Sequence, residues 1–459
     1  MTQKTLTETI SSDKDSLLFT NKQLFGLTLP LILNSLLSMV IHLADSVMVS
    51  SAGEAAVGAV SLVSSITFIF IMLITAATSG GIILTSQYVG KGDIKSSCES
   101  AKQLTYLAFF AGIFIAVVLT FLRTPILKLA YSTIEPDVFE NCRTYLLCLA
   151  WGYPFFAIGA SCTAILRSIG KNALSVTLSI GMNVCNVIGN AILIFGFKMG
   201  VAGAALATAG SYVIFAATGL IVLHNKNLKV HFDNILNYKP NTEIIKKIVV
   251  VGGTAGIGDA LFYVGKLLLS ALLATFGTVA IASYSAAYDI ANFGWTGVGG
   301  FTMALGPIVG QCIGAGKTEQ AKLYLKKMTR AATVFVVVVF GLMFVFRNQI
   351  VRIYDFTPET LESAGFYMGV AALSAIFSVY SWAFLPVGAF RAAGEVAYSL
   401  ALSVSTMFIF RVGLSYLLAK VFHMGIISIW IGMWADWACR SVINFIHFKR
   451  GKWVEKKLV

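Results

Sequence analysis

Charged residues are scarce in this chain. Only 12% of its 459 residues are charged while 57% are hydrophobic, and the mean hydropathy is +0.81; a soluble globular protein carries roughly 25% charged residues. Long apolar runs such as "LAFFAGIFIAVVLTFL" and "ATVFVVVVFGLMFVF" suit a bilayer core about 30 Å thick. Because backbone groups in lipid must be satisfied within a segment, these runs predict helices. The expected fold class is an all-α polytopic membrane protein.

Recognisable catalytic and metal-binding motifs are also missing. The seven cysteines lie singly, without a C-x-x-C pair or a His/Cys cluster, so we expect no metal or redox site. The glycine-rich stretches "GKGDIKSS" and "GAGKTEQ" lack the spacing that cradles phosphates, which argues against direct use of ATP. The five histidines are dispersed, and no Ser/His/Asp order stands out. We therefore expect neither an enzyme nor a cofactor, and any work must come from an ion gradient.

The apolar runs predict twelve transmembrane helices. Their expected positions are near 23–49, 56–86, 100–122, 143–166, 173–196, 201–223, 246–274, 279–310, 328–346, 364–388, 397–419 and 424–448. An even number places both termini on the same side of the membrane. The polar leader before the first span has no small-residue cleavage site, so we interpret it as a cytosolic tail rather than a signal peptide.

The distribution of basic residues predicts on which side of the membrane the termini lie. With cytosolic termini, 24 of the 34 lysines and arginines lie in cytosolic segments and seven on the opposite side. The remaining three, Lys266, Arg411 and Arg440, fall inside spans. The positive-inside rule thus predicts a multi-pass protein of the cytoplasmic membrane with both termini in the cytosol. The net charge of +13 is then a topology signal and implies no nucleic-acid partner.

The chain repeats itself after 224 residues. "SQYVGKGD" aligns without a gap with "GQCIGAGK", which pairs Gln87 with Gln311. "LRSIGKNALSVTLS" aligns likewise with "FRAAGEVAYSLALS", which pairs Arg167 with Arg391. Because Arg, Gln and Gly rarely coincide at one constant offset by chance, the pattern indicates an internal duplication.

The duplication defines the expected domains. They are a cytosolic tail (1–22), a six-helix lobe (23–223), a cytosolic linker (224–245), a second six-helix lobe (246–448) and a basic tail (449–459). Six spans in each half give both halves the same orientation, so their symmetry axis runs along the membrane normal, as in two-lobed secondary transporters. Two like bundles that rock against each other give alternating access to a cleft between them.

Five segments carry a resemblance to a known family: "ADSVMVSSAGEAAVGAVSL", "SQYVGKGD", "LRSIGK", "NVIGNAILIFGFKMGVAGAALAT" and "IGMWADWACRSVI". In these segments the chain resembles the multidrug and toxic compound extrusion (MATE) family, in particular its NorM- and DinF-like bacterial branches. The resemblance covers roughly residues 20–450. It implies export of organic cations and drugs in exchange for H⁺ or Na⁺. We expect small-molecule drugs, the coupling ion and the lipid bilayer as partners, and a monomer.

An ionisable side chain inside a membrane protein marks a functional site by default, because charging it there is costly. Asp45 in the first span matches the acidic position that the family uses for cation coupling, and His42 lies on the same helical face. Asn183, Asn186 and Asn190 line one face of the fifth span. We predict that these five residues form the coupling site, with Na⁺ as a possible ligand; hydrogen bonding between helices is the alternative for the asparagines.

The second lobe departs from the family pattern. The sodium-coupled branch carries a glutamate in the seventh span and an aspartate in the tenth; here the first aligns near Phe262 and Tyr263, and the tenth span has no acid. The second acid that the DinF-type branch has in the fifth span stands here as Asn190. The polar candidates in the second lobe are Asp259, Lys266, Asp289, Arg411 and Asp436.

These second-lobe residues suggest internal ion pairs. Lys266 is the repeat mate of His42, and we interpret it either as an internal cation paired with Asp289 or as a lysine that snorkels to the interface. Asp436 and Arg440, four residues apart, suggest a pair within one helix. Asp436 or Asp289 is expected to neutralise Arg411.

Aromatic and methionine side chains provide candidates for drug contact, because soft, flat surfaces suit flat cations. The candidates are Phe68, Met72, Tyr153, Tyr284, Tyr288 and Trp295. Two other functions remain open at this point. One is a lipid-linked oligosaccharide flippase of the same superfamily; the other is an ion channel or structural membrane subunit, against which the duplication argues.

Overall fold

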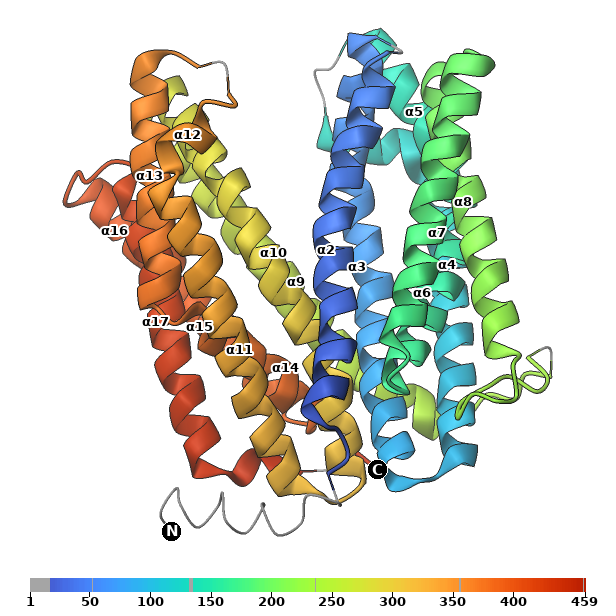
Figure 1. The fold of residues 1–459 in the computed structure, drawn as a ribbon. Helices are drawn as coiled ribbons and strands as arrows, with labels where there is room; N and C mark the ends of the chain where they lie inside the picture. The colour runs from blue at the N-terminus through green and yellow to red at the C-terminus, as the bar shows by residue number, and fades with distance from the viewer. Residues whose placement is uncertain (1–16, 52, 132–134, 236, 355, 457) are drawn as a thin grey trace.

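The computed structural model describes residues 17–51, 53–131, 135–235, 237–354, 356–456 and 458–459, and these contain helices and no strand. The helices form two groups, which stand side by side in Figure 1. The first lobe contains α2 (Asn21–Ser50), α3 (Glu54–Lys91), α4 (Ile94–Ala130), α5 (Pro136–Ala150), α6 (Tyr153–Ser168), α7 (Asn172–Asn190), η2 (Ala191–Gly196) and α8 (Gly200–Leu223). The second contains α9 (Thr242–Ala274), α10 (Thr278–Gly314), α11 (Thr318–Val345), α12 (Arg347–Val351), α13 (Pro358–Phe377), α14 (Tyr380–Ala392), α15 (Val396–Thr406), η3 (Met407–Leu414), α16 (Ser415–Lys420), α17 (Ile427–Arg450) and η4 (Lys452–Val454).

Ten helical segments of the described chain are long and apolar enough to cross a membrane, and the bent pair α5–α6 makes an eleventh. The helix α17 has 24 residues, the length of a span. Its charged residues, Asp436 and Arg440 among them, make it less apolar than the others. With α17 included, the chain follows the path of twelve spans that the sequence predicts.

Two of the expected spans are broken rather than continuous. The span expected at 143–166 consists of α5 and α6, which meet at 53°; Gly152 and Pro154 lie at this break, where proline begins a helix readily but cannot continue one. The span expected at 364–388 consists of α13 and α14. Between them Val379 has a left-handed backbone with φ of 51°, a strained conformation for a β-branched residue.

The duplication extends to the backbone conformation of the turns. Gly53 and its repeat mate Gly277 have φ of 103° and 88°. The pairs Gly92–Gly316 and Gly170–Gly394 also have positive φ. Since only glycine adopts these conformations at little cost, glycine at mate positions is explained by the same turn built twice.

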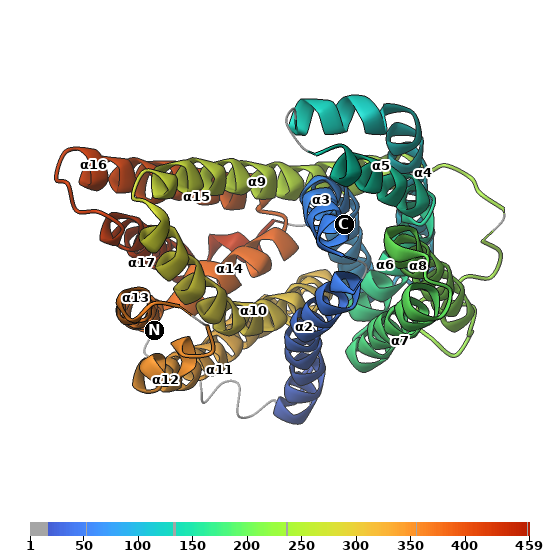
Figure 2. The same ribbon diagram turned by 90° about the horizontal axis from the view of Figure 1, so that it is seen from above.

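The lobes pack against each other through their first two helices. A Cβ added to Gly256 in α9 would lie 2.8 Å from the Cβ of Ala76 in α3, and a Cβ added to Gly300 in α10 would lie 2.6 Å from the Cα of Ile32 in α2. These two contacts are repeat mates. Figure 2 shows α3 and α10 at the seam between the lobes. The lobes converge at the end where α2 begins and the chain's last residues lie, and diverge toward the other end (Figure 1).

Candidate functional site

The first-lobe carboxylate, Asp45, lies near the end of α2, where it faces the polar side of α7. The amide nitrogen of Asn190 donates a hydrogen bond of 3.1 Å to Asp45 Oδ1. Asn190 and Asn186 are 2% and 7% exposed, so both amides lie inside the lobe. The structure therefore brings together three of the five residues that the sequence predicts for the coupling site.

The second amide, that of Asn186, bridges Asp45 and α8. One terminal atom of this amide lies 3.0 and 3.2 Å from the two carboxylate oxygens, and the other lies 3.0 Å from Oγ1 of Thr208. A carboxylate accepts hydrogen bonds, so we assign the nitrogen to the Asp45 side and the oxygen to Thr208, whose hydroxyl donates to it. An amide that bridges in this way can turn its oxygen toward a bound cation instead.

The side-chain oxygen of Asn190, beside Asp45, is a hydrogen-bond acceptor that no described residue uses. Oδ1 of Asn190 is buried and has no hydrogen-bond partner among the described residues. Directly after Asn190 the helix widens into the π-helical turn η2. Such turns occur frequently at functional sites, and a buried acceptor without a donor can accept a hydrogen bond from water or contact a bound cation.

Three further residues lie around Asp45 that the sequence did not single out. They are Thr208, Tyr145 in α5 and Tyr212 in α8; both tyrosines lie close enough to interact electrostatically with Asp45. The repeat provides a signal for one of them, because the 224-residue shift aligns Tyr212 with the charged Asp436.

The other two predicted members lie apart from this cluster in what the structure describes. The side chain of His42 is outside the described part of the chain. Asn183 is half-buried on the preceding turns of α7, and no hydrogen bond links its side chain to Asp45. The described site is therefore Asp45, Asn186, Asn190 and Thr208, with the two tyrosines around it.

The donor set suits a small hard cation. A carboxylate, two amide oxygens and a hydroxyl are oxygen ligands of the kind that alkali and alkaline-earth ions prefer. The same carboxylate accepts a proton. The arrangement can thus hold Na⁺ or H⁺ inside the first lobe.

The second-lobe carboxylate, Asp436, is held by charged groups instead. Asp436 in α17 is fully buried, and the Arg440 guanidinium donates a hydrogen bond of 2.9 Å to its Oδ1. Arg411 in η3 lies 3.8 Å from Oδ2 and is also buried. The pair that the sequence predicts within α17 is present, and Asp436 is the partner of Arg411.

The remaining charged candidates lie separately in the second lobe. Asp259 and Asp289 are both exposed along α9 and α10. Lys266 Nζ lies 5.4 Å from the ring centre of Tyr263 and 5.3 Å from that of Tyr288. Its charge acts on Asp289 without a direct ion pair within 4.0 Å.

The aromatic and methionine candidates for drug contact lie in different parts of the two lobes. Phe68 in α3 is 38% exposed and lies against Tyr263 of the other lobe, with ring centres 4.7 Å apart. Tyr153 is 1% exposed in the core of the first lobe. The others are Met72, which is half-buried in α3, and Tyr284, Tyr288 and Trp295, which belong to an aromatic cluster inside the second lobe.

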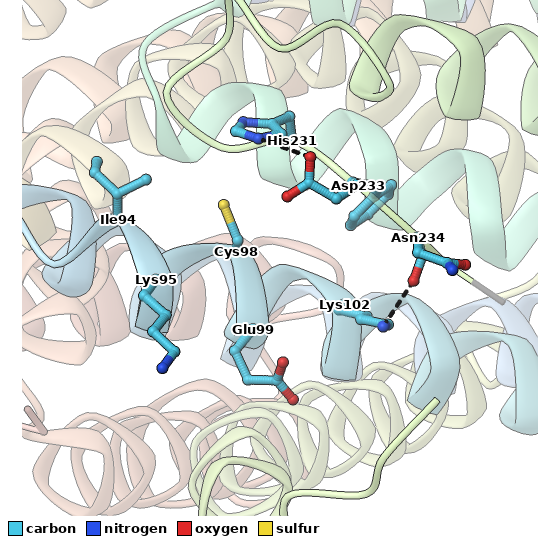
Figure 3. Close-up of a pocket in the computed structure, with 9 residues that line it drawn as sticks. Ile94, Lys95, Cys98, Glu99, Lys102, His231, Asp233 and Asn234 are labelled. Carbon is cyan, nitrogen blue, oxygen red and sulfur yellow. Dashed lines mark hydrogen bonds and ion pairs between the residues drawn. The ribbon is translucent and has the colours of Figure 1, made fainter. Parts of the chain in front are cut away.

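A separate pocket of about 430 Å³ lies at the linker, between the first turns of α4 and residues 231–234. Figure 3 shows side chains of both signs around it. Lys102 Nζ donates 2.8 Å to the backbone oxygen of Asn234, and His231 Nε2 lies 3.4 Å from Asp233. The Lys102 contact fastens the linker to the first lobe, and the His231–Asp233 contact lies within the linker itself.

Comparisons with known proteins find similar proteins over nearly the whole chain. The MatE family model matches twice, at residues 30–192 and 255–417, once in each half of the duplication. The chain is 24% identical over 442 residues to the "Probable multidrug resistance protein NorM" of Thermotoga maritima, covering 95% of this chain and 94% of that protein. It is 25% identical over 430 residues to the "Multidrug export protein MepA" of Staphylococcus haemolyticus, covering 93% of each.

Solved structures share the fold. A structure described as the outward-facing conformation of a multidrug resistance MATE transporter superposes with a TM-score of 0.85 at 19% identity, covering 95% of this chain and 97% of that chain. A MOP superfamily transporter from Pyrococcus furiosus superposes with a TM-score of 0.86, also at 19% identity and the same coverage. From the double match of the family model, the chain belongs to the MatE family, the family of MATE transporters.

Proposed function

We propose that this protein is a secondary active multidrug exporter that releases amphipathic organic cations in exchange for H⁺ or Na⁺, with the ion bound at Asp45. The observation that carries the proposal is the cluster of part-buried Asp45 with the buried amides of Asn186 and Asn190, in which Oδ1 of Asn190 has no hydrogen-bond partner among the described residues. Relatives named as multidrug export proteins support the drug-export part. By the positive-inside rule, the protein sits in the cytoplasmic membrane with cytosolic termini.

Ion binding at this cluster has a direct structural consequence. A proton or Na⁺ neutralises Asp45, and the carboxylate then no longer requires the N–H groups of both amides. The amides turn or separate, which alters the contact between α2 and α7. Because α2 also packs on α10 of the second lobe, the change reaches the interface between the lobes. An ion that binds the two arrangements of the lobes with different affinity shifts their populations, which is the basis of coupled transport.

The experiment is efflux of ethidium from proteoliposomes driven by an imposed pH step or an imposed Na⁺ step. We expect Asp45→Asn to abolish the efflux that the productive gradient drives, because the amide neither binds a proton nor carries the charge that holds Na⁺. Asp137→Asn is the matched control, since it makes the same change at an exposed position of the same lobe.

Unimpaired gradient-driven efflux in Asp45→Asn would overturn the coupling role of Asp45. Absence of efflux with either gradient in the unmodified protein would overturn the proposal of ion-driven drug export itself. A response to the pH step without a response to the Na⁺ step assigns H⁺ as the coupling ion, and the reverse assigns Na⁺.

A further inference from the structure

The two lobes meet most closely where the repeated segments "SQYVGKGD" and "GQCIGAGK" cross, near the ends of α3 and α10. Ser86 and Gly310 are repeat mates, and a Cβ added to Gly310 would lie 2.8 Å from the Cβ of Ser86. A residue touches its own mate only on the symmetry axis. The pseudo-two-fold axis therefore passes between the two helices at this point.

Two glutamines tie the lobes together symmetrically around this axis. Gln87 of the first lobe donates from Nε2 to the backbone oxygen of Ala392 in the second lobe, at 2.7 Å. Its mate Gln311 donates from Nε2 to the backbone oxygen of Ser168 in the first lobe, at 2.6 Å. Ala392 and Ser168 are themselves mates and end the helices α14 and α6. Carbonyl groups at helix ends lack partners within the helix, so each glutamine satisfies a group that would otherwise be unpaired.

Two glycines make this approach possible. A Cβ added to Gly90 would overlap the backbone oxygen of Gln311, and a Cβ added to Gly314 would overlap the backbone oxygen of Gln87. The obstacle is the backbone of the opposite lobe in both cases, so a larger residue is tolerated only if the lobes move apart. Glycine at 90 and 314 is thus required by the closed arrangement of this end rather than by the fold of either lobe.

We propose that Gln87 and Gln311 form a clasp that holds the lobes together at this end and sets the ratio of outward-facing to inward-facing protein. The inference rests on the proposed alternating-access export, in which this end must open to receive the drug. Both hydrogen bonds of the clasp cross between the lobes, so both break when the cytosolic side opens.

One half of the clasp has an additional contact. The backbone N–H of Leu458 donates to Oε1 of Gln87 at 3.0 Å, so this side chain bonds at both ends. Upstream, Trp453 is fully buried against Phe390 of the second lobe. Trp453 thus contacts the second lobe and Leu458 bonds to a glutamine of the first, and these two contacts reinforce the clasp on that side.

The test replaces each glutamine by methionine, which has a similar length and no hydrogen-bonding group. Loss of one such bond shifts an equilibrium by about fivefold. Loss of both carbonyl bonds, at separate sites, shifts it by about 25-fold or more, because Gln87→Met also removes the bond from Leu458. The matched control is Gln103→Met. Gln103 is also buried and donates to a backbone oxygen, that of Lys239, but this bond ties the linker to the first lobe and does not cross between lobes.

Spin-label distances read the equilibrium directly, in a background with the seven native cysteines replaced by alanine. Labels at Lys171 and Glu319 span the lobes at the clasp end, and labels at Asp137 and Glu359 span them at the other end; all four positions are exposed or part-exposed at helix starts and turns. We expect Gln87→Met with Gln311→Met to lengthen the first distance and shorten the second. Gln103→Met should leave both distances as in the parent protein.

Distributions that match those of the parent protein in the double variant would overturn the clasp. If the double variant fails to fold, which broadens both distributions, the single variants decide: shifts in the same direction, at least as large for Gln87→Met as for Gln311→Met, support the clasp, and unshifted distances refute it. Gly314→Ala offers an independent route, because it should favour the inward-facing distances although it removes no hydrogen bond. These distances are measured without drug or ion gradient, so failure of the clasp leaves the efflux test of Asp45 untouched.

Discussion

The two lobes share a scaffold, but the described contacts of part-buried Asp45 in the first lobe differ from those of fully buried Asp436 in the second. In the first lobe Asp45 is bonded by the neutral amides of Asn186 and Asn190. In the second lobe Asp436 is bonded by the guanidinium of Arg440, with that of Arg411 3.8 Å away. The repeat brings the two sites into register, since Tyr212 near Asp45 is the mate of Asp436.

The partners of the two carboxylates indicate which lobe is suited to exchange an ion. A neutral amide gives up its contact when a proton or Na⁺ arrives, and its oxygen can take part in binding the ion. A guanidinium is tethered to its helix and remains charged at every physiological pH, so it cannot be replaced without leaving a buried charge. We therefore propose that the exchangeable cation binds in the first lobe and that the ionic cluster of the second lobe has a structural role.

The largest expected effect comes from Asp436→Asn. This change leaves Arg411 and Arg440 buried without a carboxylate, and breaking a buried ion pair in this way costs about 3–5 kcal/mol. We expect a large fall in the melting temperature of the detergent-solubilised protein, followed by tryptophan fluorescence. Asp45→Asn should melt close to the unmodified protein. Equal melting temperatures for the two variants would contradict the structural role of Asp436 and its difference from Asp45.

Asn190→Asp sharpens the comparison by adding a second carboxylate beside Asp45. Two carboxylates at hydrogen-bonding distance share a proton and retain it to higher pH than one does. The pH dependence of H⁺-driven ethidium efflux should therefore move upward by about one pH unit or more. Asn183→Asp makes the same change on the same helix, away from Asp45, and should leave the profile in place. Identical profiles for both variants would argue against a direct contact at position 190.

Lys266→Met tests whether the second lobe repels cationic drugs, and its effect should be the smallest. Lys266 is positioned near the rings of Tyr263 and Tyr288, where a cationic substrate would otherwise bind favourably. Removal of its charge should lower the KM for ethidium about two- to fivefold, given the usual strength of such contacts. The KM for an uncharged dye provides the control. A parallel change for both dyes would attribute the effect to packing rather than charge.

The sequence predicted the helical class, the duplication and part of the site, for identifiable reasons. Polar residues at constant spacing in apolar runs are conspicuous, and this singled out Asp45, Asn186, Asn190 and the Asp436–Arg440 pair. Thr208 and Tyr145 were missed because they approach Asp45 only through the packing of α8 on α7 and of α5 on α8. The breaks at Gly152 and Val379 were missed because their flanking runs are apolar on both sides.

The residues of the proposed clasp were visible in the sequence, but their contacts were not. Gln87 and Gln311 were part of the evidence for the duplication, and alignment shows only that two positions correspond. That each glutamine reaches a carbonyl of the opposite lobe follows from the crossing of α3 and α10, which no local pattern encodes.

The most direct test of the assignment to one lobe is the number of coupling ions bound per chain. For the ion that the efflux experiment identifies, binding is measured on purified protein, as ²²Na⁺ retained or as protons released to a pH dye. We expect one ion per chain, lost in Asp45→Asn and retained in the double variant Asp259→Asn with Asp289→Asn. Ion binding that survives in Asp45→Asn, or that disappears in the second-lobe double variant, would contradict it.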